Sequence, residues 1–168
     1  MILAWWKRPK LRVLLVCRAN VCRSPMGEAL LRRRLGSMGL HRQVAVASAG
    51  TTAVRGQPPD PRAKAALAAA GCPPPRGASR PLTPRDFQRH NFILAVDRPV
   101  LDHLHHHCPD PLQDRLNLVT AWAEGLAGIE IPDPYYGSAV AFDRVRDLLD
   151  HALGHFVERA LLPRLAQG

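Results

Sequence analysis

The sequence is poor in aromatic residues and has no long apolar run. Phe, Trp and Tyr make up only 5% of its 168 residues, although the net charge is +9. Most arginines are scattered, apart from Arg32 to Arg34 on a predicted helix. Because surfaces that bind nucleic acid combine clustered basic side chains with aromatic ones, this composition argues against a nucleic-acid partner. No segment approaches the roughly 20 apolar residues of a membrane span. The opening MILAWWKRPK has its basic cluster after six mostly apolar residues, whereas a signal peptide carries its charge first. We therefore predict a cytoplasmic protein without membrane insertion.

Cysteine is scarce and is not arranged as metal sites usually require. Of the four cysteines, Cys17 and Cys22 lie close together, but no second pair follows at the spacing of a zinc site. His103 and His107 lie four apart, without a third ligand that the sequence places. A chain of this length can bury a sufficient core without disulfides, and reduced thiols are typical of the cytoplasm. We expect neither a metal nor another cofactor.

The apolar pattern predicts an α/β fold. Strands are expected at 11–17, 43–48, 92–96 and 116–122. Ser24-Pro25, Asp60-Pro61 and Thr83-Pro84 each place a capping residue before a proline, which predicts three helix starts, and Gly71 is suited to end the second of these helices. A last helix from Ser138 carries one apolar stripe through Phe142, Val145, Leu149, Ala152, Phe156 and Ala160.

Strands that alternate with helices predict a three-layer sandwich with a central four-stranded parallel sheet and helices on both faces. We expect residues 1–10, with Trp5 and Trp6, to form an extension, and residues 11–168 to form a single domain. The Pro-rich stretch at 71–81 is expected to be a surface loop.

The stretch VCRANVCRSP (16–25) is the strongest candidate for chemistry. Cys17 ends the first predicted strand, and a helix follows Arg23, so the N–H groups of the intervening loop can converge on an anion. The helix N-terminus and the guanidinium groups nearby favour the thiolate form of Cys17. Arg23 can hold two oxygens of a tetrahedral oxyanion, and Ser24 can donate its hydroxyl to the sulfur. A buried strand-end cysteine without a role would explain Cys17 alone, but not these residues together.

At these residues the sequence resembles the low molecular weight protein tyrosine phosphatases of bacterial type. Their signature is Cys, five residues, Arg and then Ser or Thr, with an Asn, a second Cys and a following Pro. The resemblance continues, in the family's order, through ASAGT (47–51), GQPPDPRA (56–63), SRPLT (79–83), ILAVD (93–97) and IPDPYYG (131–137). It implies a flavodoxin-like fold and a phosphatase without a metal or cofactor.

The resemblance also implies roles for individual residues. Cys17 would attack phosphorus to form a cysteinyl-phosphate, with Arg23 and the loop of Arg18, Ala19, Asn20, Val21 and Cys22 around the phosphate. Asp133 would act as general acid and then base, although Asp before Pro is more often a turn residue. Ser24 would help expel the sulfur, Asn20 would support the loop with Ser48, and Tyr135 and Tyr136 would line the mouth of the site. The implied partner is a phosphotyrosine protein such as an autophosphorylating bacterial tyrosine kinase, and a monomer is favoured.

Several departures and rival functions stay open. Arg18 and Val54 replace common family residues at the site, and a loop-supporting histidine is replaced near Gly77. Arsenate reductases of this fold need two further cysteines close together, whereas Cys72 and Cys108 are far apart in sequence. Protein-arginine phosphatases usually have Thr in place of Val21. A non-catalytic phosphate-binding module is the remaining alternative, and Cys22 is either a redox partner for Cys17 or a small buried residue.

Overall fold

The framework of the protein is a four-stranded parallel sheet. The computed structural model describes residues 8–167, so Trp5 and Trp6 lie outside the described residues. The strands are β1 (Leu11–Cys17), β2 (Val44–Gly50), β3 (Phe92–Ala95) and β4 (Leu116–Leu118), in the spatial order β2-β1-β3-β4. Since all the paired strands are parallel, their carboxyl ends meet at one edge of the sheet.

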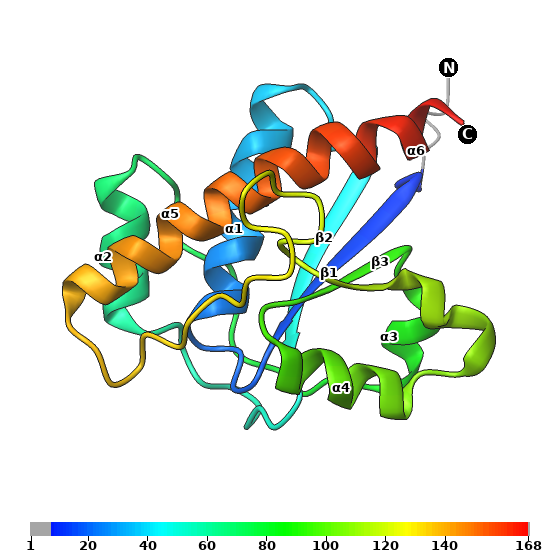
Figure 1. The fold of residues 1–168 in the computed structure, drawn as a ribbon. Helices are drawn as coiled ribbons and strands as arrows, with labels where there is room; N and C mark the ends of the chain where they lie inside the picture. The colour runs from blue at the N-terminus through cyan, green and yellow to red at the C-terminus, as the bar shows by residue number, and fades with distance from the viewer. Residues whose placement is uncertain (1–7, 168) are drawn as a thin grey trace, which may run out of the picture.

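Helices cover both faces of this sheet (Figure 1). On one side α1 (Arg23–Ser37) packs on β1 and β2, and α5 (Ala139–Phe156) packs on α1. α2 (Pro61–Ala69) contacts both of these helices, α3 (Pro84–Arg89) leads into β3, and α4 (Arg98–His107) packs on β3 and β4. The predicted three-layer α/β sandwich is thus confirmed. No helix in the described range 8–167 combines the length and the hydrophobicity of a transmembrane span.

The position of β1 explains where the functional site lies. The chain passes from β1 to β2 on one side, and later returns to β3 on the other side of β1. In open parallel sheets the crevice at such a reversal, beyond the carboxyl ends of the strands, is the usual ligand site. The loop that follows Cys17 occupies this crevice.

The predicted strands are correct in number but not in every boundary. β1 has its predicted limits, β2 runs over Val44–Gly50 instead of 43–48, and β3 ends at Ala95 instead of residue 96. β4 ends at Leu118, whereas the sequence predicted a strand through residue 122. Beyond it the chain winds into consecutive turns, in which the N–H groups of Ala121 and Ala123 bond to Leu118 and Thr120. Buried turns are as apolar as buried strands, so hydrophobicity does not separate them.

Two of the three predicted helix starts are confirmed. The Asp60 carboxylate accepts a hydrogen bond from the Arg62 N–H, and Thr83 forms a capping box with Asp86. The prediction for Ser24 was wrong, because α1 begins at Arg23 with Cys22 at its N-cap. α2 ends as predicted, with Gly71 in the left-handed region (φ 64°) just beyond it.

The last helix has the predicted apolar stripe, since Phe142, Phe156 and the other stripe residues up to Phe156 are buried. It is not regular as far as Ala160, however. A wider π turn (Val157–Leu161) separates α5 from α6 (Leu162–Ala166). Pro163 has no N–H to donate to the carbonyl four residues earlier, which accounts for the irregularity.

The Pro-rich segment 71–81 is largely an exposed loop, as predicted, but Cys72 is buried at its start. Its end joins the sheet. Gly50 donates to the Arg80 carbonyl and accepts from the Leu82 N–H, so the chain continues the outer edge of β2.

Candidate active site

The loop between β1 and α1, residues 18–22, has an unusual backbone at its centre. Asn20 has φ 58° and is the one non-glycine residue with positive φ between residues 8 and 167. Asn tolerates this left-handed conformation better than most residues do. The conformation directs the Asn20 N–H at the Cys17 sulfur, 3.2 Å away.

The Cys17 sulfur is placed to receive a second hydrogen bond, from Ser24. The two atoms Sγ and Oγ are 2.9 Å apart. Ser24 Oγ already accepts a hydrogen bond from Asn20 Nδ2 at 2.8 Å, and its own hydrogen can go either to the sulfur or to the Ala49 carbonyl at 3.4 Å. The Asn20 N–H and, in one of its two orientations, the Ser24 hydroxyl therefore point at a buried sulfur.

Both polar atoms of the Asn20 side chain, Nδ2 and Oδ1, make hydrogen bonds. Its second Nδ2 hydrogen bonds to Ser48 Oγ at 3.0 Å, and its Oδ1 accepts the Arg80 N–H at 2.9 Å. Ser48 in turn donates to Glu28, whose pKa is raised by burial in spite of this bond. The main-chain N–H of Arg80 thus supports the loop through Asn20.

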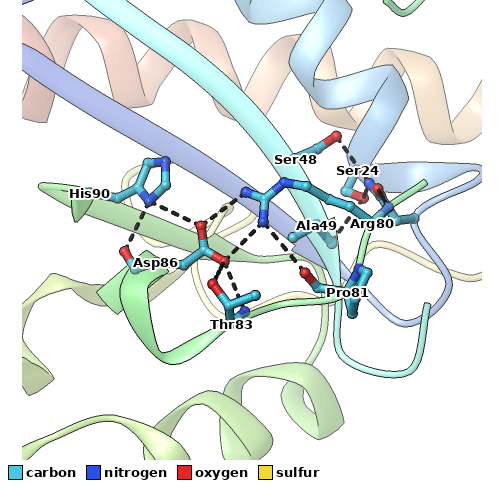
Figure 2. Close-up of polar contacts among 9 residues, drawn as sticks. Ser24, Ser48, Ala49, Arg80, Pro81, Thr83, Asp86 and His90 are labelled. Atoms are coloured by element: carbon cyan, nitrogen blue, oxygen red, sulfur yellow. Dashed lines mark hydrogen bonds and ion pairs between the residues drawn. The ribbon is translucent and has the colours of Figure 1, made fainter. Parts of the chain in front are cut away.

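Arg80 is anchored by a two-pronged ion pair with Asp86. The two Nη atoms lie 2.9 and 3.0 Å from the carboxylate oxygens, and Thr83 donates to the same carboxylate through its N–H and its hydroxyl. Figure 2 shows this cluster beside β2, with the Arg80 guanidinium between Asp86 and the Pro81 carbonyl. Burial disfavours the charge of Asp86, but the bonds from Arg80 and Thr83 outweigh it and lower the pKa of the carboxyl.

Arg23, the first residue of α1, is buried, and its guanidinium is held by residues that follow β3 and precede α5. One Nη donates to Asp97 at 2.6 Å and to the Ile131 carbonyl at 3.0 Å. The other lies 3.5 Å from Asp133. Asp97 follows β3 and also caps α4 through Val100. Sequence reasoning did not assign Asp97 to the site, although a carboxylate directly after a strand, in the quoted ILAVD, was an available signal.

Asp133 and the two tyrosines lie on the segment before α5. The Asp133 side chain is half exposed, and it accepts a hydrogen bond from the Tyr135 N–H at 3.2 Å. The rings of Tyr135 and Tyr136 meet edge to face with centroids 5.0 Å apart. Tyr136 is 96% exposed, so this pair is free to contact a large ligand at the rim.

A cavity of about 460 Å³ adjoins these groups. Arg23 and Asp133 line it together with Arg18, Asp97, Thr51, Thr52, Pro99, Val100, His103, Glu130, Ile131 and Pro132. The structure therefore brings Cys17, Arg23, Ser24, Asn20, Ser48 and Asp133 into one connected site. Ala19 and Val21 lie in the same loop, and the Val21 carbonyl accepts the Asp60 N–H.

His103 lines the cavity described above, whereas the other histidines of the run at 103–107 and the other three cysteines are not among its lining residues. Cys22 is buried at the N-cap of α1, and burial, with help from Asp60 and Cys17, raises its pKa to about 12. All four cysteines are free thiols, with Cys72 beyond α2 and Cys108 beyond α4. His103 and His107 stack with centroids 4.2 Å apart. Across residues 8–167, no three His, Cys, Asp or Glu side chains gather as metal ligands do.

The chain matches a family model and several known proteins over most of its length. The family model for low molecular weight phosphotyrosine protein phosphatase matches residues 12–164. A low molecular weight protein-tyrosine-phosphatase of Streptomyces coelicolor is 34% identical over 145 residues, covering 84% of this chain and 88% of that protein.

Two solved structures are similar over most of their length. The low molecular weight phosphotyrosine phosphatase of Vibrio cholerae is 36% identical with a TM-score of 0.83, covering 88% of this chain and 95% of that one. The arginine phosphatase YwlE of Geobacillus stearothermophilus is 27% identical with a TM-score of 0.81, covering 94% and 97%. With the family model matching nearly the whole chain, this protein belongs to the low molecular weight phosphotyrosine protein phosphatase family.

Proposed function

We propose that this protein hydrolyses phosphotyrosine in proteins through a phosphorylated cysteine at position 17. One observation carries the proposal. The Cys17 sulfur lies at the start of α1 within reach of the Asn20 N–H and the Ser24 hydroxyl, beside a cavity lined by both Arg23 and Asp133. A nucleophile beside a cavity that is lined by an oxyanion binder and an acid supplies the parts that phosphoryl transfer requires.

In the first step the Cys17 thiolate attacks phosphorus. The S–P bond forms as the bond from phosphorus to the tyrosine oxygen breaks, and Asp133 in its acid form gives that oxygen its proton. The N–H groups of the Cys17 loop and the guanidinium of Arg23 stabilise the charge on the three other phosphate oxygens. Asp97 acts as a positioning residue, because it holds Arg23 in place at 2.6 Å.

In the second step a water molecule attacks the cysteinyl-phosphate. Asp133, now a carboxylate, takes a proton from this water as its oxygen bonds to phosphorus and the S–P bond breaks. The electron pair of that bond returns to the sulfur. Ser24, 2.9 Å away, stabilises the departing thiolate with its hydroxyl hydrogen.

Phosphotyrosine is the substrate that the rim favours. Tyr135 and Tyr136 offer aromatic faces on which a phenyl ring can stack, and Val21 adds apolar surface within the loop. The likeness to an arginine phosphatase structure supports phosphoarginine as the second candidate. We further propose an autophosphorylating bacterial tyrosine kinase as the protein substrate, and a monomeric enzyme in the cytoplasm, where its four free thiols would stay reduced.

The proposal is tested with an aryl phosphate and two variants. Cys17→Ser should abolish hydrolysis while vanadate still binds, because the loop donors and Arg23 remain. Asp133→Ala should lower kcat by about a hundredfold or more, the size of a lost general acid. Asp114→Ala, an exposed carboxylate beyond α4, is the control and should change little. Turnover by Cys17→Ser, or an unchanged rate in Asp133→Ala, would disprove the mechanism. Rates on phosphotyrosine and phosphoarginine peptides then decide the substrate.

A further inference from the structure

The outer edge of β2 has main-chain N–H groups without partners in the part of the chain that the structure describes. In a parallel pair of strands, alternate residues point their N–H and C=O groups at the neighbour. The Gln43 carbonyl accepts from Leu11, and the Thr51 N–H donates to Cys17, so the odd-numbered residues of this segment face β1. The even-numbered residues therefore face outward, away from the sheet.

Both ends of this outer edge are occupied, and between them the Val46 carbonyl accepts a hydrogen bond from Arg32 at 2.7 Å. Val44 donates to the Leu40 carbonyl, and Gly50 bonds to Arg80 and Leu82. Between them the N–H groups of Val46 and Ser48 have no hydrogen-bond partner among residues 8–167. Unpaired strand edges are templates for an additional strand. The contact of Gly50 with residues 80–82 is already a parallel pairing of that kind, made by the chain itself.

Two cavities flank this part of the edge. One, of about 760 Å³, lies between β2, α1 and the loop at 73–77. The other, of about 360 Å³, lies between β2 and the residues around α3. Ala45 and Val46 line both. Since the side chains of a strand alternate between its two faces, a strand added here would send alternate side chains into the two cavities.

The charge around the edge is positive and largely uncompensated. Three arginines line the first cavity and four line the second. Three of these seven bind carboxylates, namely Glu28, Asp150 and Asp86. The other four, for which no carboxylate partner is found within the described range 8–167, are Arg12, Arg76, Arg85 and Arg89. Asp86 is the one acidic side chain in either lining, and Arg80 already neutralises it.

We propose that the outer edge of β2 binds an acidic segment of a partner protein as an additional strand. The main chain of that segment accepts hydrogen bonds from the N–H groups of Val46 and Ser48. Its acidic side chains pair with Arg76 in one cavity and with Arg85 and Arg89 in the other. Strand addition of this kind combines main-chain affinity with side-chain specificity. The opposing explanation is that the arginines only prevent this edge from aggregating.

Amide hydrogen exchange tests the hydrogen bonds of the added strand. The probe is a ten-residue peptide that repeats Glu-Glu-Thr-Thr, so that Glu side chains point to both faces of the added strand. It is added to the full chain, with a peptide that repeats Lys-Lys-Thr-Thr as its control. The acidic peptide should slow exchange at Val46 and Ser48, and leave unchanged Ala45 and Ala47, whose amides face β1. If the acidic peptide does not protect Val46 and Ser48, or if the Lys peptide protects them equally, the proposal is wrong.

Paired charge reversals test the recognition of acidic side chains. Arg76→Glu with Arg85→Glu should weaken binding of the acidic peptide by about tenfold or more, because both partners become repulsive. The control, Arg144→Glu with Arg164→Glu, makes the same change in net charge on the exposed surface of α5 and α6 and should weaken binding by less than about twofold. Both double variants should hydrolyse an aryl phosphate at the wild-type rate, which separates docking from the proposed catalysis.

If the two double variants weakened binding of the acidic peptide equally, the net charge of the protein alone would explain the binding, and the proposal would be overturned. Protection of the same amides by an oligoribonucleotide but not by the acidic peptide would likewise overturn it in favour of nucleic acid. Because binding is measured directly, neither result depends on whether the protein is a phosphatase.

Discussion

At the scale of single residues, Asn20 organises the candidate active site. Its main-chain N–H reaches the Cys17 sulfur, and its side-chain nitrogen binds both Ser24 and Ser48. Its side-chain oxygen receives the Arg80 N–H. Only a residue that tolerates positive φ and carries both a donor and an acceptor can do all of this at once, which explains an asparagine at this position.

Ser24 is the residue that should separate the two chemical steps. In Ser24→Ala the departing sulfur loses its hydroxyl donor, so breakdown of the cysteinyl-phosphate should slow and kcat should fall by about tenfold or more. Rapid-quench kinetics with an aryl phosphate should then show a burst of phenol. Ser37→Ala, at the exposed end of α1, is the control. A variant with wild-type kcat and no burst would remove Ser24 from the mechanism.

Cys22 should be unreactive in the folded protein. Because its pKa is raised to about 12 by burial and by Asp60 and Cys17, it is a neutral thiol at pH 7.5. Iodoacetamide at that pH should leave Cys22 unmodified in the native protein and modify it in urea, as peptide mass spectrometry can measure. Modification of native Cys22 at the rate of an exposed thiol would contradict this. A protected thiol would also make any disulfide with Cys17 slow to form.

At the scale of secondary-structure elements, the segment from the end of the Pro-rich loop to α3 supports the Cys17 loop through a hydrogen bond to Asn20. Arg80 bonds through its main chain to Asn20 and Gly50, and through its side chain to Asp86. Asp86 belongs to the capping box of α3. The start of α3 and the loop that holds Cys17 are therefore linked by a chain of hydrogen bonds and one ion pair.

Asp86→Asn should weaken this connection. The ionised carboxylate has a lowered pKa, so its stabilising effect is present above its ordinary value of 3.8 and is lost as pH falls through the folded-state value. At pH 7 the variant should lose about 1–3 kcal/mol in free energy of unfolding, with the deficit shrinking in acid. Urea titrations at pH 7 and pH 3 measure it. Asp102→Asn, exposed on α4, is the control, and a deficit that is the same at both pH values would refute the charge-based explanation.

At the scale of the whole molecule, α5 joins the layers through its apolar stripe. Phe156 is fully buried, and its ring meets those of Phe92 and Trp122, each with centroids 5.2 Å apart. Phe92 begins β3, and Trp122 lies in the turns beyond β4. One side chain therefore connects the last helix to the sheet and to the turns beyond β4.

Phe156→Ala should lower the free energy of unfolding by about 3–5 kcal/mol, because it leaves a cavity where three aromatic rings meet. Val140→Ala removes apolar atoms from the same helix at a position that is 73% exposed, and it should change stability by less than about 0.5 kcal/mol. Thermal or urea unfolding measures both. Similar losses in the two variants would show that this aromatic cluster is not part of the stabilising core.

Local sequence signals located the four strands and several helix ends. Alternating apolar runs indicated four strands, and Asp60, Thr83 and Gly71 marked helix ends, because capping and positive φ depend on neighbouring residues only. The same reasoning failed at Ser24, whose side chain has a tertiary partner instead of a cap, and at residues 119–122, where buried turns are as apolar as a strand.

By itself, therefore, the sequence determined the parallel α/β architecture and the position of a cysteine loop between the first strand and the first helix. Only the tertiary structure decided that Asp97 holds Arg23 and that Arg80 and Asp86 support Asn20. It also decided that two N–H groups on the edge of β2, between two arginine-lined cavities, have no partner among residues 8–167. Asp97 and Arg23 are 74 positions apart along the chain. Such contacts arise because strand order brings distant strand ends together, and no short-range pattern encodes which strand lies beside which.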